Sequence, residues 1–109
     1  MTAIFLILAI VSGYAPSAGG INCDSDCSVT ASGLPPGPGI ASCGYGWELG
    51  TRLVVPGYGV VTCGDRFSSR KYARVHKLPL YAVDLWFASA TEANAWGVRE
   101  LTVAQIFTE

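Results

Sequence analysis

The chain has 109 residues, of which 50% are hydrophobic and 14% charged, and its formal net charge is −1. This length fits one domain around a single core, and we expect residues 1–109 to form it. So small and balanced a charge excludes attraction of nucleic acid or an anionic membrane by the overall field, so a ligand has to be recognised by a shaped groove. Thirteen glycines and six prolines predict many turns and short strands, and therefore a mainly β domain.

The first predicted element is the unbroken apolar run of residues 3–11. It is too short to span a bilayer as a helix, so no stable membrane span is expected. Its length matches the core of a signal peptide, but no Lys or Arg precedes it. A buried strand explains the same pattern. We favour the strand, with a signal-like segment as the alternative.

Residues 17–38 are rich in Gly, Ser, Pro and Asp and predict a long irregular loop. A short strand is predicted at residues 40–43. The β-branched runs at residues 51–55 and 59–63, separated by Pro-Gly-Tyr, predict a hairpin. Residues 66–77 are polar and basic and predict a second loop.

The last third of the chain predicts two strands with a short helix between them. Residues 81–87 have strand character, and residues 101–107 close the chain as a final strand. The helix begins at Ser89, which can cap it with Glu92 as the capping-box partner, and Gly97 offers a left-handed stop.

The chain contains an even set of cysteines, namely Cys23, Cys27, Cys43 and Cys63. In a small domain this favours disulfides and a compartment outside the cytoplasm, and the three possible pairings remain open. Structural zinc is disfavoured because only the first two cysteines are closely spaced and His76 is the sole histidine. We therefore expect no metal and no organic cofactor.

A series of short motifs follows a fixed order along the chain. They are Thr-Ala-Ser-Gly at 30–33, Gly-Ile-Ala-Ser-Cys at 39–43, Trp-Glu-Leu-Gly-Thr-Arg-Leu at 47–53, Pro-Gly-Tyr-Gly at 56–59, Cys-Gly-Asp-Arg at 63–66, Ala-Val-Asp-Leu-Trp-Phe at 82–87, Ala-Asn-Ala-Trp-Gly-Val-Arg at 93–99 and Leu-Thr-Val at 101–103. Together they resemble the 3D (three-aspartate) domain, over residues 12–107. The resemblance implies a six-stranded double-psi β-barrel with one or two short helices.

The 3D family includes lytic transglycosylases similar to the membrane-bound A type, so the resemblance implies peptidoglycan as the partner and cleavage of its MurNAc–GlcNAc bond to 1,6-anhydro products. Asp84 lies at the position of the family's third aspartate and is the candidate acid/base. Asp65, at the second, would support it. Thr30 is a candidate hydrogen-bond donor to the sugar or to Asp84.

Aromatic side chains supply further candidates for binding sugar rings. Tyr45 and Trp47 are assigned to the groove as substrate-binding residues, because aromatic faces can stack on sugars. Trp86 alternates within a strand and Trp96 ends the helix, so core packing is predicted for both.

The sequence departs from the family at the first aspartate, where Cys43 stands, and in a longer segment between Asp65 and Asp84. The resemblance places the segments of Cys43 and Cys63 side by side, which implies a disulfide between them. The departure keeps a second function open, a noncatalytic wall-binding or virion structural module on the same barrel. Either function implies an extracytoplasmic place, as a secreted, envelope or phage virion or lysis protein. The pairing of Cys23 and Cys27, the glycan specificity and the oligomeric state are left open.

Overall fold

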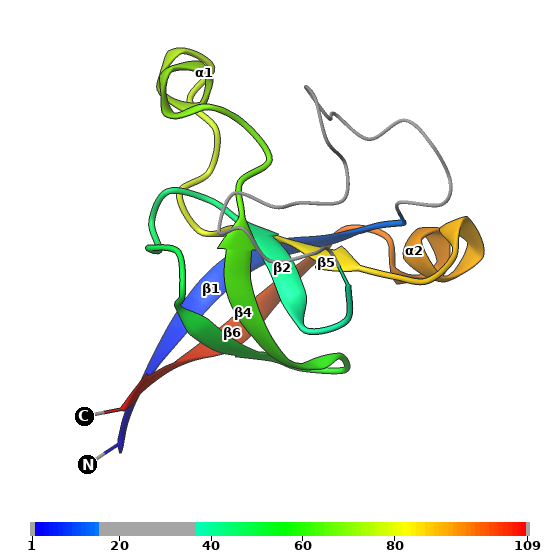
Figure 1. Ribbon diagram of the computed structural model, residues 1–109, viewed down its shortest axis with the longest axis horizontal. Helices are drawn as coiled ribbons and strands as arrows, with labels where there is room; N and C mark the ends of the chain where they lie inside the picture. The colour runs from blue at the N-terminus through cyan, green and yellow to red at the C-terminus, as the bar shows by residue number, and fades with distance from the viewer. Residues whose placement is uncertain (1, 16–36, 109) are drawn as a thin grey trace.

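The computed structural model describes residues 2–15 and 37–108. They form a closed six-stranded β-barrel with two short helices, which confirms the predicted mainly β architecture (Figure 1). The elements are β1 (Thr2–Tyr14), β2 (Ile40–Cys43), β3 (Arg52–Val55), β4 (Gly59–Asp65), α1 (Arg70–Val75), β5 (Ala82–Trp86), α2 (Ala90–Trp96) and β6 (Arg99–Thr108).

The barrel has an internal twofold pattern. Its strand order is β1-β5-β2-β4-β3-β6, with the pairs β1/β5 and β2/β4 parallel and all other pairs antiparallel. If β1 is exchanged with β4, β2 with β5 and β3 with β6, the same set of strand pairs results, each with the same direction. The two halves of the chain therefore interlock, as a double-psi barrel requires, and β2 and β5 meet at the centre.

The apolar run at residues 3–11 is a barrel strand in the structure, as favoured from the sequence. β1 pairs with β6 from Thr2 to Val11, and with β5 only from Ile10 to Tyr14. Its first half therefore extends with β6 beyond the rest of the barrel, toward the two chain ends (Figure 1). Several large apolar side chains on this extension are exposed, among them Ile4, Phe5, Leu6 and Leu8.

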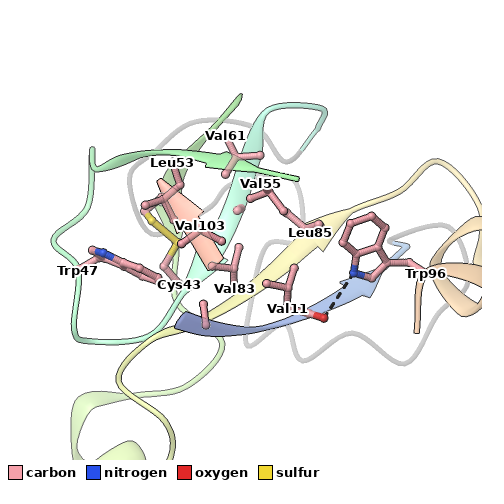
Figure 2. Packing of buried hydrophobic residues seen from close by; sticks show 13 residues of the cluster. Val11, Cys43, Trp47, Leu53, Val55, Val61, Val83, Leu85, Trp96 and Val103 are labelled. Atoms are coloured by element: carbon pink, nitrogen blue, oxygen red, sulfur yellow. Dashed lines mark hydrogen bonds between the residues drawn. A yellow bond between two sulfur atoms is a disulfide. The ribbon is translucent and has the colours of Figure 1, made fainter. Parts of the chain in front are cut away.

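The core fills the barrel interior. Valine and leucine side chains from five strands meet there with Ala41 and Cys43 of β2 and exclude water. The fully buried ones labelled in Figure 2 include Val11, Leu53, Val55, Val61, Val83, Leu85 and Val103. The Cys43–Cys63 disulfide lies among them, joining β2 to β4 with 5.5 Å between the Cα atoms. This confirms the predicted pairing. The other two cysteines, Cys23 and Cys27, lie outside the described residues.

Helix α2 forms where the sequence predicts a short helix, and it packs on the core through Trp96. The Ser89 side chain accepts a hydrogen bond from the Glu92 backbone N–H, and Gly97 ends the helix with a φ of 70°. Trp96 is buried and donates from Nε1 to the Val11 carbonyl over 3.4 Å (Figure 2). Its predicted role in core packing is therefore confirmed.

The prediction that residues 66–77 form only a loop was wrong, because they contain helix α1. Ser69 caps this helix by accepting a hydrogen bond from the Tyr72 N–H over 3.1 Å. None of the helix residues is buried. The sequence therefore lacked the apolar stripe by which amphipathic helices are predicted.

Removal of the Cys43–Cys63 bridge should destabilise the fold. The bond closes a loop with a sequence separation of 20, and chain entropy then predicts a loss of about 3 kcal/mol in the free energy of unfolding for Cys43→Ala/Cys63→Ala. Urea unfolding under oxidising conditions measures this. Cys23→Ser/Cys27→Ser is the matched control, and an equal midpoint for wild type and the first variant would contradict a structural bridge.

Candidate functional site

Four polar side chains form one row across neighbouring strands of the barrel. The strand register aligns Ser12 of β1 with Asp84 of β5, Asp84 with Ser42 of β2, and Ser42 with Asp65 of β4. The strands run side by side in this order. Residues separated by as many as 72 positions in sequence thus lie next to one another.

The row lies on the outer face of the barrel wall. Its neighbours along the strands, such as Val11, Val83 and Cys43, are buried in the core. Because successive side chains of a strand point to opposite faces, the polar residues between them point away from that core. Ser42 is nevertheless only 6% exposed, and Asp84 is half-buried. The site is therefore sheltered from water although it lies outside the barrel interior.

A β-bulge brings Asp65 into the row. The register between β2 and β4 pairs Ala41 with Cys63 but Ser42 with Asp65, so Gly64 is passed over. Without this shift Ser42 would be aligned with the glycine and the row would contain one carboxylate. Bulges commonly re-aim side chains at functional sites.

Asp84 has the properties of a residue that can hold a proton. Burial raises the pKa of its carboxyl group, and a hydrogen bond from Ser12 Oγ to Oδ1, over 3.0 Å, partly opposes that rise. The charge of Asp65 is not among the causes of the shift. The raised pKa of Asp84 is therefore due to burial and not to repulsion by Asp65.

Tyr14, at the end of β1, lies within electrostatic reach of both carboxylates. Burial raises the pKa of its hydroxyl to about 12, with smaller upward effects from the charges of Asp84, Asp65 and Tyr58, while a hydrogen bond with Ser42 lowers it. The hydroxyl therefore stays protonated at neutral pH. It is a hydrogen-bond donor held close to two acidic groups.

An aromatic cluster adjoins this group. The ring of Tyr58 packs edge-on against Phe87 and Trp96, with ring centroids 5.4 and 6.2 Å apart. Its hydroxyl donates to the carbonyl of Trp86, the residue aligned with Tyr14. The cluster packs against the apolar core, and Tyr58 raises the pKa of Tyr14 slightly.

The sequence-predicted site residues divide into two groups. Asp84 and Asp65 lie together in the row. Trp47 is in the core, 2% exposed, with Nε1 donating to Gln105 over 3.0 Å, so its ring offers no free face for a sugar and the assignment to a groove is not supported. Tyr45 packs beside α1, where its hydroxyl donates to the Ser68 carbonyl, and Thr30 lies outside the described residues.

Sequence reasoning missed Ser12, Ser42 and Tyr14 as site residues. The signal that could have found them is a polar side chain in an apolar strand, since Ser12 interrupts the run of β1 and Ser42 that of β2. Their alignment with Asp84 depends on pairing between distant strands. No local pattern reports that pairing.

Within residues 2–15 and 37–108, no three His, Cys, Asp or Glu side chains gather as a metal site. Among the helices of these same segments, none is long and apolar enough to cross a membrane.

Comparisons of the chain with models of protein families, with curated proteins and with solved structures found no match. The function has to be inferred from the site itself and from the motifs in the sequence.

Replacing Asp84 should reveal the cost of its burial. A folded-state pKa raised above the unfolded value, about 3.9 for an aspartate, gives a stability contribution that is present at low pH and lost as the pH rises through the folded-state pKa. Asp84→Asn removes this loss, so the variant should be more stable than wild type at neutral pH, with the difference vanishing in acid. Urea unfolding from about pH 3 to pH 8 measures it.

Ser12→Ala should change the stability at neutral pH in the direction opposite to Asp84→Asn. The lost hydrogen bond no longer favours the carboxylate, so the pKa of Asp84 should rise further and stability at neutral pH should fall. Carbon-13 NMR of the Asp84 carboxyl group follows the pKa directly. A stability difference between Asp84→Asn and wild type that does not change with pH would contradict the assignment.

Proposed function

We propose that the protein is a peptidoglycan-cleaving enzyme of the lytic transglycosylase kind, related to the 3D domain, with Asp84 as its acid/base. The observation that carries the proposal is the setting of Asp84: a half-buried carboxyl group whose pKa is raised by burial, in one row with Asp65 and near the Tyr14 hydroxyl. The order of the motifs along the chain, given above, supplies the substrate class.

The reaction suits a single carboxylic acid. Protonated Asp84 gives its proton to the oxygen that links C1 of MurNAc to GlcNAc, and the C1–O bond breaks. The resulting carboxylate then takes the proton of the C6 hydroxyl of the same MurNAc, whose oxygen bonds to C1 and gives the 1,6-anhydro sugar. A pKa raised toward neutrality serves both steps, because the group must donate and then accept.

Two other groups have defined supporting roles in this proposal. Asp65 orients the substrate and stabilises the positive charge that develops on the sugar ring. Tyr14, protonated at neutral pH, donates a hydrogen bond to a substrate oxygen. Ser12 is a positioning residue, since it acts through its hydrogen bond to Asp84.

The absence of the family's first aspartate weighs less against catalysis than the sequence alone suggested. Cys43 is 1% exposed, and its disulfide lies in the core. An aspartate at this position would direct its carboxyl group among valines, away from the row. Its replacement therefore removes no carboxylate from the outer face of β2.

The disulfide is also the observation that favours the second candidate, a noncatalytic wall-binding or virion structural module. It joins β2 and β4 on the core side of the row and stiffens the barrel. A stiff barrel suits a structural protein as well as it suits an enzyme. Both candidates fit an extracytoplasmic compartment, where such bonds persist.

Digestion of purified peptidoglycan tests the proposal. Wild type should release fragments with 1,6-anhydro ends, identified by mass spectrometry, and Asp84→Asn should lower the rate at least about 100-fold, as expected for loss of a general acid/base. Asp84→Asn is expected to stay folded, so loss of activity cannot be ascribed to unfolding. Reducing ends in place of anhydro ends would mean that water attacks, as in ordinary glycosidases, and binding without cleavage would leave the structural module.

The pH profile separates catalysis by Asp84 from a merely structural role. Activity should fall on the alkaline side as Asp84 loses its proton, and Ser12→Ala should move this fall to higher pH because it raises the pKa of Asp84. A profile unchanged by Ser12→Ala would count against Asp84 as the acid.

A further inference from the structure

Positive charge is concentrated in the segment that contains helix α1. Residues 66–77 hold five of the seven Lys and Arg residues and no acidic residue, in a chain whose formal net charge is −1. On the helix, Arg70 and Arg74 are four positions apart, where like charges destabilise a helix. A charge pattern that opposes local stability suggests that the cations are needed for another purpose.

Three of these cations line one surface hollow. The hollow measures about 390 Å³ and lies between α1, the turn at Gly44 and Tyr45, and residues 78–80. Arg70, Arg74 and Lys77 line it together with apolar side chains, namely those of Phe67, Leu78, Pro79 and Leu80. It thus combines positive charge with an apolar surface.

Tyr45 and Arg66 hold the hollow in place. The Tyr45 hydroxyl donates to the Ser68 carbonyl over 2.8 Å, and its ring lies 4.4 and 4.6 Å from the guanidinium carbons of Arg66 and Arg70. Arg66 also donates to the Cys43 and Gly44 carbonyls, over 3.2 and 2.6 Å. Tyr45 and Arg66 therefore have structural roles.

Arg74 and Lys77 have no such role. Neither makes a salt bridge within the described residues, so their charge is available to a ligand. Lys77 also adopts a left-handed backbone, with a φ of 51°, a conformation that favours glycine. The position turns the chain out of α1, and a lysine there costs about 1 kcal/mol that a glycine would not.

The hollow is built on the chain segments that leave the polar row. Gly44 follows Ser42 by two residues on one side, and Phe67 follows Asp65 by two on the other. A ligand extended along the row therefore has a second, chemically different place to bind next to it.

We propose that this hollow binds the stem peptide of peptidoglycan, with its carboxylates on Arg74 and Lys77 and its alanine methyl groups on the apolar surface. The inference rests on the proposed function for the identity of the polymer. A phosphate polymer of the wall would match the charges but would leave the apolar surface uncovered, so the peptide fits better.

The test uses a free stem tetrapeptide without sugar, alanyl-γ-glutamyl-diaminopimelyl-alanine, and calorimetric titration. Wild type should bind it, more weakly as salt rises. Arg74→Gln/Lys77→Gln should weaken binding about tenfold. Lys71→Gln is the matched control, because Lys71 lies on the same helix but does not line the hollow, and it should change binding little.

Lys77→Gly separates binding from folding. It should raise the melting temperature, because glycine relieves the left-handed strain, and it should weaken peptide binding nonetheless. Equal losses in Lys71→Gln and the double variant, or no binding by wild type, would overturn the inference. Neither result touches the proposed function, because glycan cleavage is measured separately, as the release of 1,6-anhydro ends from intact peptidoglycan.

Discussion

The alternation of side chains along β1, β5, β2 and β4 is the constraint on which the rest of the structure depends. One set of side chains from these strands builds the apolar core, and the set between them builds the polar row on the outer face. A slip of one residue in any pairing would exchange the two sets. The rigidity of the core therefore fixes the geometry of the candidate site, and the Cys43–Cys63 bond secures the β2–β4 pairing from the core side.

The twofold pattern of the barrel explains how two carboxylates and two hydroxyls come to share the row. Exchange of the halves maps β1 onto β4 and β2 onto β5, so Ser12 corresponds to Asp65 and Ser42 to Asp84. The first half thus contributes both serines and the second half both aspartates, so each pair of equivalent positions holds one serine and one aspartate. The symmetry is broken by the bulge at Gly64 and by Tyr14, which lies near both aspartates.

Features that depend on neighbouring residues could be predicted from the sequence, and features that depend on pairing between distant strands could not. The Ser89 cap, the Gly97 stop and the hairpin at Pro56 and Gly57 depend on neighbouring residues, and they were predicted correctly. The barrel, the Cys43–Cys63 bond and the choice of Asp84 and Asp65 as site residues came from the order of motifs. Helix α1 was missed because it buries nothing, and Trp47 was misassigned because the sequence cannot tell a buried ring from an exposed one. Ser12 and Ser42 required strand pairing that no local pattern reports.

The same burial that shapes the row also limits the stability of the protein. A carboxyl group kept half-buried for a raised pKa destabilises the folded state wherever it is ionised, so the site works against the fold at neutral pH. The left-handed Lys77 and the like-charged Arg70 and Arg74 act in the same direction on α1. A small barrel tolerates these costs only with a dense core and a covalent link, and both are found directly behind the row. The disulfide is thus best understood as support for the outer face of the barrel.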